Sequence, residues 1–143
     1  KIKNMKYRIS TSKTVDIKKI DALRETVGWK KRRSDEKWKE VLSKSFFVYT
    51  VWDEDKLIGM GRILEDGTMC MFYDVVVDKS YQGKGIGKMV MEGLLNEVKD
   101  KRYTSIGLFA SENDLDFLIP FYRKFGFEGV KGGMECKKYM RYK

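Results

Sequence analysis

Hydrophobic and polar positions along the chain follow two different periods, and the change of period predicts an order of strands and helices. Residues 7–9 alternate apolar, polar and apolar, which predicts a short first strand. Residues 14–27 carry apolar side chains near helical spacing, and Gly28 is expected to end that helix. Ser34 is predicted as the N-cap of a second helix, because two acidic residues follow it where they favour the helix dipole.

Three strands are predicted in the middle of the chain. Residues 46–52 are rich in aromatic and β-branched side chains, and residues 57–64 and 69–77 continue this character. The glycines within 57–64 predict a bulge or close packing. The acidic residues of 53–56 resemble the head of a calcium loop, but the glycine and glutamate that such a loop needs are missing. We therefore expect a hairpin turn there.

A strand, a glycine loop and a helix follow each other around position 80. The valine-rich end of residues 69–77 predicts a buried strand, and apolar residues after Gly85 change to helical spacing. Residues 103–110 alternate again and predict another strand. Because a helix lies between the two strands, a right-handed crossover would make them parallel.

The last third of the chain predicts a short helix and further strands. Residues 117–125 are mostly apolar, and Pro120 suits the first turn of a helix better than its interior. Gly126 is expected to end this helix. Residues 127–142 are predicted to form one or two closing strands around the glycine pair at 132 and 133.

The loop from Gln82 to Lys88 has the properties of a phosphate-binding site. Its three glycines allow close approach of the backbone, and unpaired N–H groups at the start of the following helix favour an anion. Two lysines add positive charge. The spacing fits neither a dinucleotide fingerprint nor a nucleotide P-loop, since Met89 stands where the P-loop needs Ser or Thr.

Composition limits the chemistry that remains. The chain has 143 residues, which suits one domain, and it contains no histidine, which excludes a His triad, a His general base and a His metal site. Its two cysteines are not spaced as metal ligands, and we expect them to be reduced thiols. No apolar run is long enough to span a bilayer. We expect a cytoplasmic protein without a signal peptide or a membrane partner.

A net charge of +9 raises the question of nucleic-acid binding. The charges are scattered, however, and the only tight basic cluster is 30–33. The aromatic residues lie in core-like strands and are not interleaved with the charges, as a single-strand binder would require. We therefore expect no nucleic-acid partner, and we interpret most lysines as a solvated surface that also suits a polyanionic cofactor.

Two motifs together resemble a known family. Gln82, Gly85 and Gly87 resemble the pyrophosphate loop of the GCN5-related N-acetyltransferase (GNAT) family, and Tyr122 with Gly126-Phe127 resembles its Tyr-x-x-x-Gly-Phe segment. The resemblance covers essentially the whole chain, as a single N-acetyltransferase domain over 1–143. It implies a mixed α/β (α+β) fold: a mostly antiparallel twisted sheet with a splayed parallel strand pair, flanked by about four helices.

The resemblance implies acetyl-CoA as co-substrate and an N-acetyltransferase that acts on a primary amine of a small molecule or a peptide. A non-catalytic acetyl-CoA-binding module is the alternative. The resemblance assigns the cofactor to the backbone of the valine strand, to the loop and to Asn113, although an Asx-turn explains Asn113 equally well. The implied cofactor residues are Val75, Val77, Gln82, Gly83, Lys84, Gly85, Ile86, Gly87, Lys88 and Asn113.

Acetyl transfer to an amine needs a proton acceptor and a donor to the leaving thiolate. By resemblance Tyr122 is the donor, with a core aromatic as the competing interpretation. Strand alternation would place Tyr73 and Val75 on the substrate face and Asp74 on the opposite face, so Asp74 is predicted to be structural. The base stays open between Tyr73 through water and Glu25.

The acceptor wall in this family is usually formed by the first two helices and their connection. Here this implies Arg24, Trp29 and the basic run 30–33, with Tyr73 nearby, and an acceptor that has an acidic or aromatic part. Surface charge with one packed tryptophan is an equal alternative. The oligomeric state stays open, a homodimer included.

Overall fold

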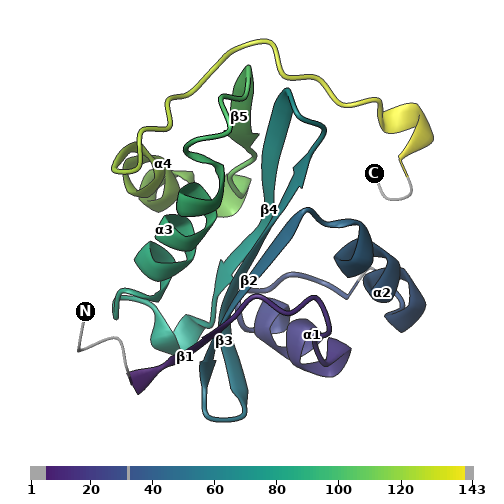
Figure 1. Cartoon of the computed structure of the whole chain (residues 1–143), viewed down its shortest axis with the longest axis vertical. Helices are drawn as coiled ribbons and strands as arrows, with labels where there is room; N and C mark the ends of the chain where they lie inside the picture. Colours follow the sequence, from purple (N-terminus) through teal and green to yellow (C-terminus); the bar gives the residue numbers. More distant parts are fainter. Residues whose placement is uncertain (1–5, 32, 141–143) are drawn as a thin grey trace. The chain divides into compact units, whose positions relative to one another are not determined.

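The computed structural model describes residues 6–31 and 33–140, which form two compact units, one ending at Phe109 and one beginning at Ala110. The first unit is a five-stranded sheet with three α-helices (Figure 1). Its strands are β1 (Arg8–Ser10), β2 (Phe47–Asp53), β3 (Lys56–Glu65), β4 (Met69–Val77) and β5 (Ser105–Leu108). Its α-helices are α1 (Ile17–Thr26), α2 (Asp35–Lys44) and α3 (Ile86–Val98).

The strands lie in the order β1-β2-β3-β4-β5. Neighbours are antiparallel except for β4 and β5, which are parallel and joined through α3, as predicted. The β5 ladder reaches only Met69–Phe72 of β4. Within the described part of the chain, the second half of β4, Tyr73–Val77, therefore has no partner in β5, and the parallel pair is open at that end.

Local sequence explains where the first two helices begin and end. The Asp16 carboxylate accepts from Lys18 N–H at 3.0 Å, so α1 begins at Ile17, three residues after the predicted position. Gly28 has φ +82° and donates to Glu25 O at 2.9 Å, which confirms the predicted glycine stop. Ser34 caps α2 through Lys37 N–H at 3.1 Å, as predicted.

The helices cover both faces of the sheet. Met60 of β3 packs into an apolar cluster with residues of α1 and α2, among them Leu23 and Trp38. Its neighbours Gly59 and Gly61 face α3, because successive side chains of a strand alternate. A β-carbon on Gly61 would lie 2.8 Å from Leu94 Cδ1. The predicted close packing at these glycines is confirmed, and it lets α3 lie directly on β3.

A β-bulge interrupts β4 at Asp74. Met60 pairs with Val76 and Arg62 with Tyr73, so the single residue Gly61 faces two residues of β4. Asp74 has φ +52°, a left-handed conformation that few residues other than glycine adopt and that aspartate tolerates better than most. The bulge breaks the alternation of side chains from this point. This is the irregularity that the glycines of β3 predicted.

The second unit contains α4 (Leu115–Arg123), preceded by the 3-10 turn η3 (Glu112–Asp114) and followed by η4 (Lys137–Tyr139). The predicted position of Pro120 in the first turn is wrong, because the helix begins at Leu115 and Pro120 is its sixth residue. Proline has no N–H to donate to the carbonyl of Asp116, and Asp116 is an exposed residue of this helix. Gly126, at φ +92°, ends the helix as predicted.

The predicted closing strands are also wrong. Residues 127–140 contain no strand, and Tyr142 lies outside the described residues. The side chains of Val130 and Met134 are 91% and 94% exposed, so this segment lacks the alternate burial that a sheet strand needs. None of the helices in 6–31 and 33–140 is long and apolar enough to cross a membrane.

Candidate active site

The loop after β4 bends at two glycines and leads directly into α3. It begins with a 3-10 turn, η2 (Lys79–Tyr81), and continues to Gly85, the N-cap of α3. Gly83 has φ +81° and Gly85 φ +87°, conformations that a side chain would strain. Gly85 provides no side-chain cap, so the first N–H groups of a 13-residue helix point out of its end.

The space in front of this loop is open. A β-carbon built on Gly83 or on Gly85 would meet nothing within 4 Å. Lys84 and Lys88 are exposed at the same loop, whereas Ile86 is buried and holds the helix start in the core. Backbone donors, the helix dipole and two ammonium groups thus share one accessible site, which fits a pyrophosphate.

Hydrogen bonds within the loop, to α1 and to β2 fix the start of the loop. The Asp78 carboxylate is buried and accepts from the Ser80 N–H at 2.9 Å and the Ser80 hydroxyl at 2.7 Å. Lys79 N–H donates to the Thr26 hydroxyl of α1 at 3.1 Å. The Tyr81 hydroxyl donates to Asp53 of β2 at 2.6 Å, and this bond raises the pKa of Tyr81 to about 12. The loop is thus tied to two other elements before it reaches its glycines.

The open end of β4 adjoins this loop. Val75 and Val77 lie in the stretch of β4 beyond the last β5 pair, where main-chain groups are available on that side. The Gln82 side-chain amide donates to the Val77 carbonyl at 3.2 Å. The strand and the loop predicted to bind the two parts of one cofactor are therefore continuous, and Gln82 joins them.

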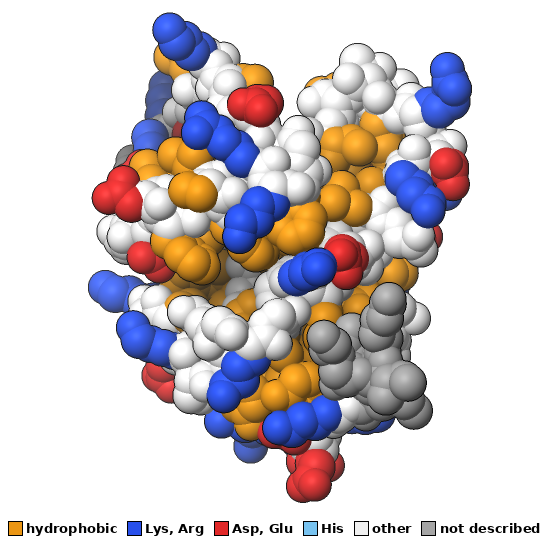
Figure 2. Space-filling view, turned by 90° about the vertical axis from the view of Figure 1, so that its left-hand side faces the viewer, with side chains coloured by type: hydrophobic (Ala, Val, Ile, Leu, Met, Phe, Trp, Pro, Cys, Tyr) orange, Lys and Arg blue, Asp and Glu red, His pale blue; other side chains and the backbone are white. Residues whose placement is uncertain are grey.

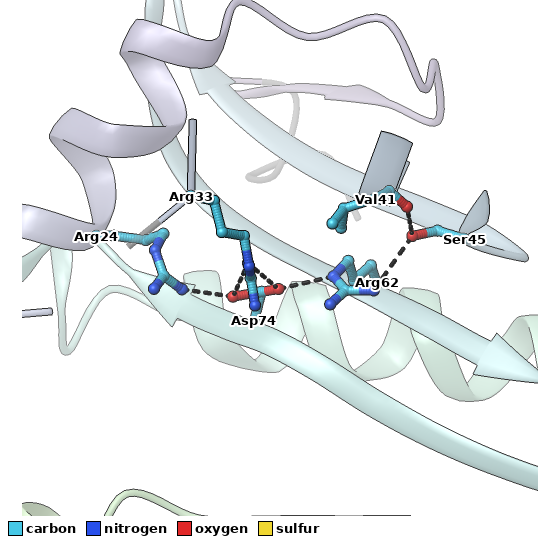
Figure 3. A network of polar contacts seen from close by, with 6 residues as sticks. All are labelled: Arg24, Arg33, Val41, Ser45, Arg62 and Asp74. Atoms are coloured by element: carbon cyan, nitrogen blue, oxygen red, sulfur yellow. Dashed lines mark hydrogen bonds and ion pairs between the residues drawn. The ribbon is translucent and has the colours of Figure 1, made fainter. Parts of the chain in front are cut away.

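Asp74 binds three arginines from three different segments (Figure 3). Arg62 Nε of β3 donates to Oδ2 at 2.7 Å, Arg33 Nη1 lies 3.2 Å from the same oxygen, and Arg24 Nη1 of α1 donates to Oδ1. Arg62 also donates to the Ser45 hydroxyl at 3.3 Å. We call Asp74 with Arg24, Arg33 and Arg62 the arginine cluster.

The environment of Asp74 makes it a poor proton acceptor. Burial by itself raises the pKa of this carboxyl, but Arg62, Arg33 and Arg24 outweigh burial and hold the pKa below its usual range. A carboxylate that binds three guanidinium groups joins α1, β3 and the segment before α2, which is compatible with the predicted structural role of Asp74. A carboxylate that points away from the acceptor was expected to bond to backbone groups; this expectation is wrong, since three arginine side chains bind Asp74.

The predicted orientation of Asp74 is also wrong. The Arg62 guanidinium lies 5.3 Å from the ring centre of Tyr73 and also binds Asp74, so Tyr73 and Asp74 lie on the same side of the sheet. The bulge explains this, because an extra residue places two consecutive side chains on one face. Asp74 therefore lies on the side that was predicted to face the acceptor.

The predicted acceptor residues surround this cluster. Arg24 stacks on Trp29, with 4.9 Å between the guanidinium carbon and the ring centre, and Arg33 stacks on Trp38 at 4.5 Å. Trp29 and Glu25 also line a surface hollow of about 430 Å³ beside α1. The structure thus brings together Arg24, Trp29 and Tyr73. Within the basic run 30–33, Arg32 lies outside the described residues.

Tyr122 and Asn113 belong to the second unit. Tyr122 is buried, its ring lies 5.2 Å from that of Phe121, and burial raises its pKa to about 12, so its hydroxyl keeps its proton at neutral pH. Asn113 is exposed in η3, whose N-cap Ser111 makes no side-chain capping bond. Their roles toward the cofactor stay predictions.

Several residues of the site were not predicted. Arg62 of β3 completes the arginine cluster and Trp38 lies against Arg33, while Asp78, Tyr81 and Thr26 fix the loop. The sequence did contain a signal for the first of these: a single arginine in the apolar stretch of β3 and a single acid in β4 each need a buried partner. Tyr81 and Thr26 carried no comparable signal, because exposed loops contain such residues routinely.

Charges on the face shown in Figure 2 do not gather into one basic surface. On the face shown in Figure 2, lysine and arginine side chains stand apart from one another among apolar and neutral surface. Among residues 6–31 and 33–140, no group of three or more Cys, Asp or Glu side chains could hold a metal ion. Cys70 is buried, which raises the pKa of its thiol to about 11, and Cys136 is exposed.

Comparisons with known proteins agree on one family. The profile described as Acetyltransferase (GNAT) family matches residues 14–127. The uncharacterized N-acetyltransferase ycf52 of Porphyra purpurea is 32% identical over 87% of this chain and 74% of its own length. Histone acetyltransferase TAP1 of Glycine max is 32% identical over 86% of this chain and 58% of its own.

Solved structures show the same fold. A Streptococcus pneumoniae acetyltransferase of the GNAT family superposes with a TM-score of 0.74 and is 27% identical, covering 92% of this chain and 98% of that protein. A Staphylococcus aureus protein named as a probable acetyltransferase gives a TM-score of 0.79 at 31% identity, with the same coverage.

Proposed function

The chain belongs to the acetyltransferase (GNAT) family, and from this premise we propose that it transfers the acetyl group of acetyl-CoA to a primary amine of a small molecule or a peptide. The single observation that carries the proposal is the loop at the end of β4. Two glycines with positive φ, an uncapped helix start and two exposed lysines meet there in front of open space. This arrangement fits the pyrophosphate of coenzyme A.

The backbone of Val75 and Val77 holds the pantetheine arm in this proposal, and the loop from Gln82 to Lys88 holds the pyrophosphate. The open end of the parallel pair supports this assignment, because β4 keeps main-chain groups there that β5 does not use. The family profile spans parts of both compact units, which supports a single N-acetyltransferase domain.

The chemistry requires a group that takes a proton from the acceptor amine and a group that gives a proton to the departing sulfur. The acceptor ammonium loses a proton before its nitrogen attacks the thioester carbonyl. A C–N bond then forms, the C–S bond breaks, and the nitrogen releases a second proton as the amide forms, which replaces the proton that the departing sulfur takes. In the proposal the Tyr122 hydroxyl donates its proton to the departing sulfur. Asp74 is a weak acceptor for the ammonium proton, because three arginines lower the pKa of its carboxyl. Water near Tyr73, or Glu25, remains as the acceptor.

Two measurements test the proposal. Calorimetric titration with acetyl-CoA reports binding, and release of free thiol in the presence of a panel of primary amines reports transfer. We expect saturable binding and amine-dependent thiol release. Binding without thiol release from any amine would favour a non-catalytic acetyl-CoA-binding module, and absence of binding at millimolar acetyl-CoA would overturn the assignment of the loop.

A further inference from the structure

The arginine cluster carries more positive charge than its own carboxylate neutralises. Three guanidinium groups face the single Asp74 carboxylate. Asp21 also attracts the Arg24 guanidinium, but it is itself paired with Lys31 at 3.5 Å, so it offsets the excess only in part. An excess of positive charge at a partly buried position is costly without a counter-ion, so the cluster suits an anion that arrives from solution.

The members of the cluster differ in how far they are exposed to solvent. The side chain of Arg33 is 30% exposed and that of Arg24 is 13% exposed, whereas Asp74 is 4% exposed. An incoming anion therefore reaches Arg33 and Arg24 first, and Arg62 and Asp74 stay behind them. Figure 3 shows Arg24, Arg33 and Arg62 converging on Asp74 from different segments.

The outer arginines are held in place before any ligand binds. Each uses one Nη1 atom toward Asp74, and a guanidinium has five N–H donors. Trp29 lies against the Arg24 guanidinium and Trp38 against that of Arg33. A planar donor group fixed in this way binds a carboxylate in a two-pronged arrangement at little cost in conformational entropy.

The position of the cluster relates it to the reaction. Asp74 is the chain neighbour of Val75, and the Arg62 guanidinium also stacks on Tyr73. An anion held by Arg24 and Arg33 thus lies next to the stretch of β4 to which the proposed function assigns the acetyl-carrying arm. The cofactor's own pyrophosphate is assigned elsewhere, to the glycine loop.

We propose that Arg24 and Arg33 bind a carboxylate of the acceptor, so that the substrate is an amine that also carries an acidic group, such as a peptide with a free C-terminus or an amino acid. This inference rests on the proposed function. Asp74 is a positioning residue that orients the two arginines, with Arg62 as its buried partner. The reacting amine then extends from the anchored carboxylate toward the open end of β4.

Matched acceptors test the inference. Glycylglycine and glycylglycinamide present the same amine, but only the first has a carboxylate. We expect the wild-type kcat/KM to be at least about tenfold higher for glycylglycine, the loss that one charge-assisted hydrogen bond typically causes. Arg33→Gln should remove this preference by raising the KM for glycylglycine, and should leave the KM for glycylglycinamide and for acetyl-CoA unchanged. Lys39→Gln, on the exposed side of α2, makes the same change of charge and should alter none of these values.

A binding measurement separates this inference from the proposed function. Because Trp29 and Trp38 stack on the two arginines, tryptophan fluorescence should respond to glycylglycine and much less to glycylglycinamide, and the difference should disappear in Arg33→Gln. Selective binding without acetyl transfer would leave the anion site standing and contradict the proposed function. Three results would overturn the anion site. The fluorescence response could be equal for the two peptides or absent for both. Arg33→Gln could lower kcat/KM equally for both peptides, or it could raise only the KM for acetyl-CoA.

Discussion

Gly93 of α3 lies against the ring of Tyr49 in β2, so closely that a β-carbon on Gly93 would come within 2.2 Å of Tyr49 Cε2. The Tyr49 ring is buried, and it therefore cannot move aside without opening the interface between α3 and the sheet. A glycine inside a helix normally costs stability relative to alanine. Here the missing side chain lets α3 approach the sheet.

Gly93→Ala should therefore destabilise the protein although alanine is the better helix former. Overpacking costs about 1–3 kcal/mol, and the gain in helix propensity returns about 1 kcal/mol, so the free energy of unfolding should fall by up to about 2 kcal/mol. Urea denaturation measures this change. Gly133→Ala is the control, since position 133 is open. In a Tyr49→Leu background the cost of Gly93→Ala should shrink; an unchanged cost would show that the ring is not the obstacle.

Asp74→Asn should be strongly destabilising, because it leaves three arginines close together without their carboxylate. Loss of one partner of a buried ion pair typically costs about 3–5 kcal/mol. The folded variant should still bind acetyl-CoA, and its pH–rate profile should keep a rising limb, since Asp74 is not the base. A loss of several orders of magnitude in turnover in a folded, cofactor-binding variant would identify Asp74 as the base instead.

The same carboxylate should make stability depend on pH at the acidic end. Its pKa is lowered in the folded state relative to an ordinary value of 3.8, so in acid the unfolded chain binds a proton first. The stabilisation by Asp74 is complete above the unfolded pKa and disappears as the pH falls through the folded pKa. The advantage of wild type over Asp74→Asn should thus begin to shrink below about pH 4 and keep shrinking as the pH falls further. Parallel urea titrations from pH 7 to pH 3 measure the difference; a constant difference would contradict the assignment.

Gly85→Glu should abolish the rise in melting temperature that acetyl-CoA causes in wild type. The substitution places a side chain and a negative charge in the open space before α3, where the pyrophosphate is assigned. Gly67→Glu is a matched control, because Gly67 has a similar positive φ of +95°, faces open space and lies in the turn between β3 and β4. Both variants should lose similar intrinsic stability, and only Gly67→Glu should keep the response to acetyl-CoA. The same response in both would remove the loop from the binding site.

Tyr122→Phe deletes a hydroxyl whose pKa of about 12 keeps it protonated at every pH at which the enzyme would be assayed. If Tyr122 donates to the leaving sulfur, turnover should fall by about 10²-fold or more, the usual range for a general acid. The affinity for acetyl-CoA and the melting temperature should hardly change. Tyr139→Phe, at an exposed tyrosine of the same unit, is the control. Wild-type turnover in Tyr122→Phe would leave Tyr122 as a packing residue.

The elements that could be predicted from the sequence are those with a local cause. Ser34 has its acidic neighbours, Gly28 and Gly126 mark helix ends, and the glycine loop follows a valine strand, so each is encoded within a few residues. The parallel pairing of β4 and β5 follows from the intervening helix. The loop itself therefore needed no tertiary information.

The features that could not be predicted depend on distant residues. The left-handed conformation of Asp74 is stabilised by Arg24, Arg33 and Arg62, which are 50, 41 and 12 positions away. Strand alternation gave the wrong face because a bulge opposite Gly61 cannot be read from β4 alone. The glycine pair near position 132 suggested a turn between strands. The apolar side chains on either side of it, Val130 and Met134, are exposed, so they form no buried face of a strand.

The hydrogen bond from Lys79 N–H to the Thr26 hydroxyl joins the two halves of the site mechanically. Thr26 ends the helix that carries Arg24, and Lys79 begins the loop that leads to the glycines. A ligand that immobilises one of these segments also restricts the other, and the two binding steps then form a closed thermodynamic cycle. If the bound acceptor changes the affinity for acetyl-CoA by some factor, bound acetyl-CoA must change the affinity for the acceptor by the same factor.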